Sequence, residues 1–389
     1  MAQTFFFYDL ETSGLNPRQD RIMQFAGQRT DMNLEPIGEP YNLLVTLNDD
    51  TLPTPDALMV TGITPQKTVE EGYSEAQFAR MLSEEIFMPD TIAVGFNNIR
   101  FDDEFVRHLL WRNFHDPYEW SWKDGRSRWD LLDVVRLTRA LRPEGINWPL
   151  DDKGEPSNRL ELITSANGIA HENAHDALAD VTALIAVTKL IKQKQPQLYD
   201  YLLKMRDKKV VQQLVNMDDK KPFVYASGRY DKEFAKTTVA FPLTTSRSGG
   251  VVVYDLRYDP TPFVELSAEE LSAKIFASWE ERQAENFVKL PVKELQYNRC
   301  PAVAPLGVLE QGDGWRKISL SAEVVQQHQH ILLNHPDFAE KLRTIFENKP
   351  AFKKLPDPEA QLYDGFLNDR DRIRVEAVRN ADERELADF

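Results

Sequence analysis

The sequence predicts an α/β protein in which a mixed sheet is flanked by helices, followed by a small β-rich domain and a partial helical region at the C-terminal end. Strand-like and helix-like periodicities alternate through residues 1–195. Three strand candidates precede the first long helix candidate, which indicates a mixed sheet rather than a purely parallel one. After Gln195-Pro196 the pattern changes to short strand-like runs.

The elements of residues 1–195 follow from the two periodicities, which are two residues for a strand and about 3.6 for a helix. The strand candidates are Thr4–Leu10, Arg21–Thr30, Tyr41–Leu47 and Thr91–Phe96. The helix candidates carry apolar residues spaced three and four apart, and they are Ser74–Phe87, Asp103–Arg112, Leu131–Ala140, Leu160–Ala166 and His175–Lys192.

Residues 196–348 are predicted to form the β-rich domain. Gly, Ser, Pro and Asp divide its strand candidates, which are Pro222–Ala226, Thr238–Pro242, Gly250–Leu256 and Val288–Glu294. Helical insertions are expected at Ser267–Trp279 and Ala322–Asn334. Residues 349–389 are polar, with helices expected at Glu359–Leu367 and Asp371–Val378. This last region is too short to bury a core of its own, so we expect it to pack on a neighbour or to begin a larger helical domain.

The composition is that of a soluble globular protein of two or three domains, because 389 residues exceed what one core usually spans. The single cysteine, Cys300, excludes an intrachain disulfide and fits a reducing compartment. The N-terminus shows no signal-peptide pattern, and no run of about 18 apolar residues occurs. We therefore expect a cytoplasmic protein without a membrane partner.

The charge distribution leaves room for a nucleic-acid partner although the net charge is −15. The segment Lys189–Lys236 holds twelve Lys and Arg against six Asp and Glu, a local basic excess. Such a segment could guide a phosphate backbone. A solvated, lysine-rich surface explains the same charges equally well.

Asp9 and Glu11 are the first candidates for chemistry. They follow four aromatic residues, and a strand period of two places them on the same face as Phe5 and Phe7. Two carboxylates side by side on a strand built for burial would repel each other and lose their hydration. A divalent metal ion is the simplest partner for them.

Three further residues complete the candidate site. Asp102 follows a predicted strand and opens a helix, where capping is the commoner role for an aspartate. Asp180 lies on a side of its helix that should be buried, although Asp176 competes with it for the same role. His175, five residues before Asp180, could reach the same site only from a frayed first turn or the preceding loop, and a lone histidine is more often structural.

Together these residues point to metal-assisted hydrolysis of a phosphodiester. Carboxylate oxygens select Mg²⁺, with Mn²⁺ as a substitute, over softer metals. Two such ions about 3.5–4 Å apart activate water and stabilise the leaving oxygen. A histidine with a pKa near 6.5 can accept the proton of the attacking water.

Three motifs of the chain together resemble those of a known family. The motifs are Asp9-Leu10-Glu11-Thr12, Asn98-Ile99-Arg100-Phe101-Asp102, and a pair formed by His175 and Asp180 with four residues between them. In this order they resemble the DEDDh 3′→5′ exonucleases of the proofreading superfamily, and within it the bacterial exonuclease I family of single-strand DNA exonucleases. Longer stretches that carry the resemblance are Val60–Pro65, Ser127–Val134, Leu141–Pro149 and Arg159–Ile169.

The resemblance implies a ribonuclease H-like exonuclease domain (1–195), an SH3-like domain (196–348) and the start of a helical domain (349–389) that is expected to be mostly absent. It implies four metal ligands, Asp9, Glu11, Asp102 and Asp180. It also implies that His175 is the general base, and that the backbone at Thr12 and Ser13 approaches the terminal 3′-OH. A role in DNA repair and recombination, a monomeric state, and docking of the acidic C-terminal tail of single-stranded-DNA-binding protein would follow as well.

Contacts to the strand should combine backbone charge and base stacking. Arg128, Arg142 and Arg159 are the candidates for phosphate contacts. The stretch Trp111–Trp129 is rich in aromatic and basic residues, which suits DNA, although core packing explains about half of those rings. Two alternatives remain open. An RNA-trimming 3′→5′ exoribonuclease of the same superfamily would usually have one domain, and a non-catalytic binding module would have no reason to keep all five site residues.

Overall fold

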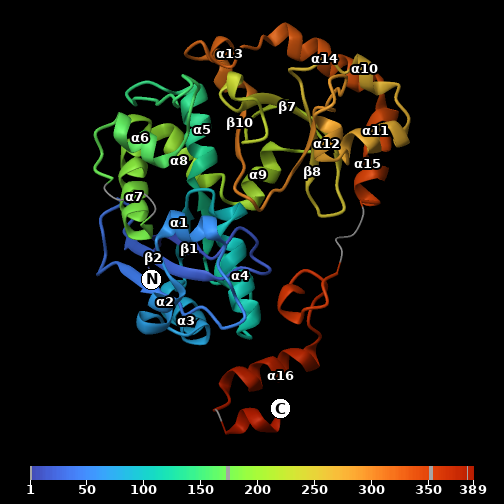
Figure 1. Ribbon diagram of the computed structural model, residues 1–389. Coiled ribbons are helices and arrows are strands. Elements are labelled where there is room, and N and C mark those ends of the chain that lie inside the picture. Colours follow the sequence, from blue (N-terminus) through green and yellow to red (C-terminus); the bar gives the residue numbers. More distant parts are fainter. Residues whose placement is uncertain (1, 172–175, 350–353, 383) are drawn as a thin grey trace. The chain divides into compact units, whose positions relative to one another are not determined.

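The computed structural model describes residues 2–171, 176–349, 354–382 and 384–389, and the chain divides into two compact units (Figure 1). The first unit comprises Met1–Leu131, Arg159–Leu190 and Phe352–Phe389, and the second comprises Leu132–Asn158 and Ile191–Ala351. Among the helices of the described residues, none has both the length and the apolar character needed to cross a bilayer.

A five-stranded sheet in the described residues organises the first unit. Its order is β3-β2-β1-β4-β5, with β1 antiparallel to β2 and parallel to β4. The strands are β1 (Thr4–Thr12), β2 (Ile22–Thr30), β3 (Tyr41–Leu44), β4 (Thr91–Gly95) and β5 (Ser127–Asp130). The predicted mixed sheet is therefore confirmed. The sequence prediction did not include β5, which is only four residues long.

The aromatic run of β1 explains why this strand is central. Phe5, Phe6, Phe7 and Tyr8 are all fully buried, so both faces of the strand are covered. On one face the Phe6 ring stacks on Phe25 of β2 with centroids 6.2 Å apart. On the other, Phe5 stacks on Trp129 of β5 at 6.2 Å. The packing fixes β1 on both sides, and its last residues carry Asp9 and Glu11.

The first unit contains α1 (Pro55–Thr61), α2 (Pro65–Glu71), α3 (Glu75–Met81), α4 (Asp102–Arg112), α6 (Leu160–Ala166), α16 (Asp369–Asn380) and most of α7 (Ala177–Lys194). Leu82–Ile86 extends α3 as a π-helical turn, and 3₁₀ turns occur at Asn98–Arg100, Glu119–Ser121, Pro358–Ala360 and Glu385–Asp388. The sequence prediction missed α1 and α2, whose signals were a capping threonine and a proline at each start.

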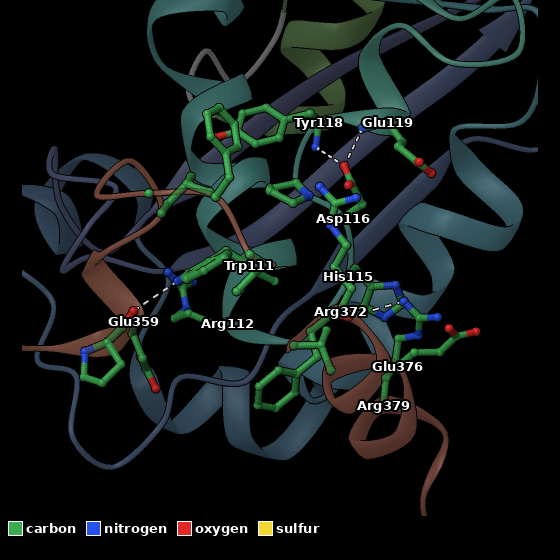
Figure 2. Close-up of a pocket in the computed structure, with 18 of the residues that line it drawn as sticks. Trp111, Arg112, His115, Asp116, Tyr118, Glu119, Glu359, Arg372, Glu376 and Arg379 are labelled. Carbon is green, nitrogen blue, oxygen red and sulfur yellow. Dashed lines mark hydrogen bonds between the residues drawn. The ribbon is translucent and has the colours of Figure 1, made fainter. Parts of the chain in front are cut away.

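The C-terminal segment differs from its prediction. A helix was expected over Glu359–Leu367, but only Pro358–Ala360 is helical, as a 3₁₀ turn, and α16 starts at Asp369. The segment packs within the first unit, where Trp111 Nε1 donates a hydrogen bond to the Pro358 carbonyl at 3.1 Å. Residues of α4, the loop after it and this segment line a cavity of about 1030 Å³ (Figure 2).

The second unit is built on an antiparallel sheet of order β10-β6-β7-β8-β9. Its strands are β6 (Phe223–Ala226), β7 (Thr237–Thr245), β8 (Val251–Asp255), β9 (Val292–Leu295) and β10 (Ala302–Pro305). Phe223, Val251 and Val303 from three of these strands are fully buried in one cluster. The β-rich prediction is confirmed, although β10 was not among the predicted strands.

In sequence order, the helices of the second unit are α5 (Leu131–Leu141, all but its first residue), α8 (Pro196–Lys204), α9 (Lys208–Leu214), α10 (Thr261–Val264), α11 (Ala268–Ile275), α12 (Trp279–Arg282), α13 (Gly314–Lys317), α14 (Ala322–Asn334) and α15 (Pro336–Glu347). Short 3₁₀ helices lie at Lys232–Phe234 and Leu306–Glu310. The helix at Ala322–Asn334 has its predicted bounds. Helices α8, α9 and α15 were not predicted.

Candidate metal centre

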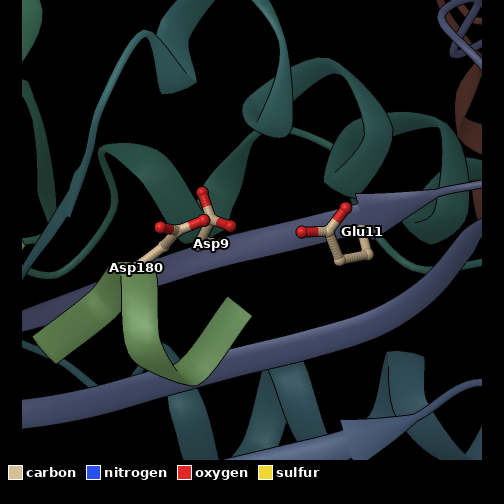
Figure 3. Close-up of side chains that lie close together, drawn as sticks. All are labelled: Asp9, Glu11 and Asp180. Carbon is tan, nitrogen blue, oxygen red and sulfur yellow. The ribbon is translucent and has the colours of Figure 1, made fainter. Parts of the chain in front are cut away.

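Three of the predicted site residues meet at one point. Figure 3 shows Asp9 and Glu11 on β1 and Asp180 on α7 with their carboxylates turned toward the same space. Among the described residues, ligand oxygens of these three side chains all lie within 4.8 Å of one another. The structure therefore brings together acids that are 171 positions apart in the sequence. Oxygen donors in this number and proximity suit a hard divalent cation.

The electrostatics of the cluster favour a cation. Burial, followed by the charges of Asp102, Asp180 and Glu11, raises the pKa of Asp9 well above its ordinary value. Burial, followed by the charges of Asp180 and Asp176, raises the pKa of Glu11 to about 8. Both shifts express the cost of holding several negative charges in a desolvated space. A positive ion among these oxygens would reverse the shifts.

Asp102 lies beside this cluster at the start of α4. It is the first helical residue, while Phe101 holds the cap position and makes no side-chain capping bond within the described residues. The carboxyl of Asp102 is 4% exposed, and burial, then the charge of Asp103, raises its pKa well above the ordinary value. Asp102 therefore does not occupy the cap position of α4, which was the alternative role for this aspartate. Its charge acts on Asp9, which places it electrostatically in the same site.

Asp103, the second residue of α4, is fully buried. Its carboxylate accepts hydrogen bonds from the Tyr8 hydroxyl, from Asn98 Nδ2 at 3.1 Å and from Arg128 at 2.5 Å. These bonds tie the start of α4 to β1 and β5. Asp103 is thus a structural anchor for its neighbour Asp102.

Arg128 was predicted to contact phosphate, and the structure gives it a different partner. Its side chain is 8% exposed and pairs with Asp103. Removing one partner of a buried ion pair typically costs about 3–5 kcal/mol, so Arg128 is not readily available to a ligand. Arg142 donates to the carbonyls of Leu141 and Val308 in the second unit, and Arg159 occupies the cap position of α6. Phosphate contacts by these three residues stay predictions.

Thr12 and Ser13 follow Glu11 directly, where a β-bulge interrupts the pairing of β1 with β2. The Thr12 hydroxyl donates to the Gly14 carbonyl at 2.7 Å. Ser13 is fully buried, its N–H donates to the Arg21 carbonyl at 2.9 Å, and its carbonyl accepts from Thr54. The backbone beside the carboxylates is therefore held in a fixed conformation.

The predicted general base, His175, lies outside the described residues. A second histidine, His171, reaches the site instead: its Nε2 lies 2.6 Å from Asp180 Oδ1, and its Nδ1 lies 3.1 Å from the Thr164 hydroxyl. Sequence reasoning missed His171 because it stands nine residues before Asp180 in a loop, where no helical or strand spacing relates the two.

Apart from the half-buried Trp111 and Tyr118, the aromatic residues of the Trp111–Trp129 stretch divide into two groups. Trp120 and Trp129 are 5% and 1% exposed and belong to the core. Trp122 and Phe114 are 64% and 44% exposed. Core packing accounts for the first group, and the second remains available for contact with a ligand.

The comparisons with known proteins agree with this geometry. The exonuclease family profile matches residues 6–188, and the profile of the exonuclease I SH3-like domain matches residues 206–348. Exodeoxyribonuclease I of Escherichia coli K12 is 41% identical over 385 residues, which cover 98% of this chain and 80% of that protein. The Haemophilus influenzae enzyme of the same name is also 41% identical, over 99% of this chain and 82% of its own length.

The chain belongs to the exodeoxyribonuclease I family. Among solved structures of this family, E. coli exonuclease I in complex with a dA16 oligonucleotide has a TM-score of 0.95 at 40% identity, covering 100% of this chain and 82% of that one. The moderately thermophilic exonuclease I from Methylocaldum szegediense has a TM-score of 0.93 at 41% identity, covering 100% and 81%. A zinc-bound form of the E. coli enzyme with single-stranded DNA is also similar.

Membership in the exodeoxyribonuclease I family confirms the predicted succession of a mixed-sheet exonuclease domain and an SH3-like domain. It makes the chain a nuclease hydrolase of a metal-dependent family. The carboxylates of Asp9, Glu11 and Asp180 are the group in the described residues that fits this dependence.

Proposed function

We propose that the chain hydrolyses single-stranded DNA stepwise from its 3′ end and releases 5′-mononucleotides, with two Mg²⁺ ions that Mn²⁺ can replace. The observation that carries the proposal is the meeting of Asp9, Glu11 and Asp180 oxygens within 4.8 Å in a chain of this family. The solved complex of the E. coli relative with a dA16 oligonucleotide supports the choice of a single strand as substrate.

The proposed metal ligands are Asp9, Glu11, Asp102 and Asp180. When bound at such a site, paired divalent ions activate a water molecule and stabilise the leaving oxygen of a phosphodiester. The carboxyl groups stand at fixed positions, because β1 is packed on both faces and Asp103 anchors the start of α4.

The protein groups around the site would supply the remaining functions. His175 would accept the proton of the attacking water as the general base, since an imidazole titrates near neutral pH. The buried backbone at Thr12 and Ser13 would approach the terminal 3′-OH. Arg142 and Arg159 would contact phosphates, and Arg128 would do so only if its bond with Asp103 were exchanged.

Binding of the strand should be dominated by the phosphate backbone and by stacking. Trp122 and Phe114 present exposed rings that any base can stack on. Because backbone contacts release counterions, binding should weaken steeply as salt rises.

We further propose domain boundaries of 1–195, 196–348 and 349–389, a monomeric state, a cytoplasmic location and a role in DNA repair and recombination. Docking of the C-terminal tail of single-stranded-DNA-binding protein on this chain remains a proposal that rests on the family resemblance.

Digestion of a 5′-labelled single strand tests the function directly. With Mg²⁺ we expect a ladder that shortens from the 3′ end and ends in mononucleotides, and EDTA should stop it. A blunt duplex of the same sequence should persist much longer. If the labelled strand stays intact with Mg²⁺ but is still retained by the protein, the non-catalytic binding alternative holds instead.

The RNA-trimming alternative requires its own comparison. Matched DNA and RNA oligonucleotides of one sequence should be degraded at very different rates, with DNA the faster. A faster loss of RNA would make the chain an exoribonuclease. The SH3-like domain over residues 206–348 favours DNA, because the curated relatives that share it are exodeoxyribonucleases.

A further inference from the structure

The segment Pro358–Tyr363 makes three hydrogen bonds within the first unit, two of them to α4 and one to Arg21. The Pro358 carbonyl accepts from Trp111 Nε1 at 3.1 Å, and Glu359 pairs with Arg21 at 2.8 Å. The Tyr363 hydroxyl donates to Glu104 at 2.5 Å. Between these contacts, Ala360 and Leu362 are buried to 2% exposure. The segment is therefore bound at its start, its middle and its end.

The contact at Tyr363 lies next to a proposed metal ligand. Glu104 is two residues after Asp102 in the first turn of α4, and it also pairs with Arg107 at 2.9 Å. The cap position of α4 makes no side-chain bond within the described residues, so contacts from other elements add to the backbone hydrogen bonds that hold its first turn. Asp103 supplies one such contact through Arg128 of β5. Glu104 supplies another through Tyr363, whose ring also lies 5.8 Å from that of His108.

The contact at Glu359 is linked through Arg21 to the chain that follows Glu11. Arg21 is 6% exposed, and its N–H donates to Ser13 Oγ at 2.9 Å while its carbonyl accepts from the Ser13 N–H at 2.9 Å. Ser13 is two residues after Glu11. Both bonds with Ser13 come from the backbone of Arg21, which fixes the chain leaving the end of β1. The guanidinium of the same arginine is held by Glu359, by the Gln19 carbonyl at 2.9 Å and by Glu75 at 3.9 Å.

We propose that Pro358–Tyr363 is a positioning element for the metal centre: Tyr363 fixes the first turn of α4 and with it Asp102, and Glu359 fixes Arg21 and with it the chain after Glu11. This inference rests on the proposed function, since it assumes that Asp102 and Glu11 bind metal. Neither Tyr363 nor Glu359 touches the reacting atoms in this assignment. Their effect is on the placement of groups that do.

The test compares Tyr363→Phe, Glu359→Gln and the double variant with a matched control. Arg379→Gln serves as the control, because Arg379 ties α16 of the same C-terminal region to the Phe114 carbonyl and contacts neither Glu104 nor Arg21. Two metal constants are measured: the Mg²⁺ concentration for half-maximal hydrolysis of a single strand, and the Mn²⁺ dissociation constant of metal-stripped protein by calorimetry. Thermal unfolding without metal reports stability separately.

We expect both metal constants of the double variant to rise by about 3- to 10-fold, less than the roughly 10- to 100-fold typical for a partner bonded directly to a ligand. The control should keep the wild-type constants, and all variants should unfold near the wild-type temperature. Wild-type metal constants in the double variant, or an equal rise in the control, would overturn the assignment. If the double variant does not fold, Tyr363→Phe alone decides in the same way.

The two proposals fail differently. Wild-type protein that binds Mn²⁺ but hydrolyses no single strand would defeat the proposed function, while the calorimetric comparison would still decide the positioning role. Wild-type protein that binds no divalent ion in calorimetry would defeat both.

Discussion

His171 Nε2 lies 2.6 Å from Asp180 Oδ1, so a loop histidine bonds directly to one of the three clustered carboxylates. The other ring nitrogen lies 3.1 Å from the Thr164 hydroxyl of α6. The imidazole is 4% exposed, which is less than the 19% of its aspartate partner. Partners of this kind orient a ligand and hold its charge toward the metal.

Replacing His171 should therefore weaken the metal centre. We expect His171→Ala to raise the Mg²⁺ concentration for half-maximal hydrolysis, or to lower the rate, by about 10- to 100-fold. Thr164→Val, which removes only the bond to Nδ1, should have a smaller effect of the same sign. A Mg²⁺ titration of oligonucleotide hydrolysis measures both. Wild-type behaviour of His171→Ala would mean that the bond to Asp180 has no catalytic consequence.

His175 should behave differently, because its proposed role is proton transfer. His175→Ala should lower the maximal rate by about 10²–10⁴-fold and leave the Mg²⁺ requirement close to that of the wild type. The inflection of the rate near neutral pH should disappear with it. Rates measured from pH 5.5 to 9 at saturating Mg²⁺ check this. A loss confined to Mg²⁺ affinity would assign His175 to the metal shell rather than to base catalysis.

The strand β1 and its two acids could be predicted because the signal is local. Four aromatic residues in a row require burial on both faces, and the period of two then places Asp9 and Glu11 together. Asp180 was included because it lies on a side of its helix that should be buried, and the family resemblance supported it, since nothing in local spacing brings Asp180 to β1. His171 could not be found in this way, because its partner is set by the path of a loop.

The pairing of Asp103 with Arg128 is a second feature that local sequence patterns could not predict. An aspartate in the first turn of a helix has a sufficient local explanation, namely the helix dipole. Only the packing of α4 on β1 and β5 shows that Asp103 is buried and paired with an arginine 25 residues later. Arg128, seen as one basic residue among several aromatics, looked like a phosphate contact for the same reason.

Asp9 and Asp180 should be required for turnover but not for folding. Burial and three neighbouring carboxylates raise the pKa of Asp9, so the metal-free fold is strained by like charge. Asp9→Asn and Asp180→Asn should abolish hydrolysis while the metal-free protein unfolds at the wild-type temperature or a few degrees above it. Thermal unfolding in EDTA together with an activity assay gives both values. Residual activity near the wild-type level would remove these residues from the metal shell.

Metal binding should release protons, because the pKa of Glu11 is raised to about 8. At pH 7 the metal-free carboxyl is largely protonated, and a cation needs it ionised. Metal affinity should therefore rise with pH around this value, by up to about tenfold per unit for one displaced proton. Calorimetry of Mn²⁺ binding at pH 7 in buffers of different ionisation enthalpy counts these protons. An identical heat in all buffers would contradict the shift.

Asp255 of the second unit offers a pH effect on stability that is independent of the metal centre. It is 6% exposed, accepts hydrogen bonds from the Thr238 hydroxyl and from the Arg257 N–H, and belongs to β8. Burial is the largest cause that raises its pKa from 3.8 to about 6, against the opposing effect of those two bonds.

The raised pKa of Asp255 means that the fold prefers the protonated carboxyl. Its contribution to the free energy of unfolding is complete below the ordinary pKa of 3.8 and is lost as the pH rises through about 6. Asp255→Asn cannot ionise, so from pH 4 to pH 7 the wild type should lose about 2–3 kcal/mol of stability relative to this variant.

Urea unfolding of the wild type and of Asp255→Asn at pH 4 and at pH 7 measures this difference in the free energy of unfolding. A difference between wild type and Asp255→Asn that stays constant with pH would show that Asp255 remains ionised in the fold.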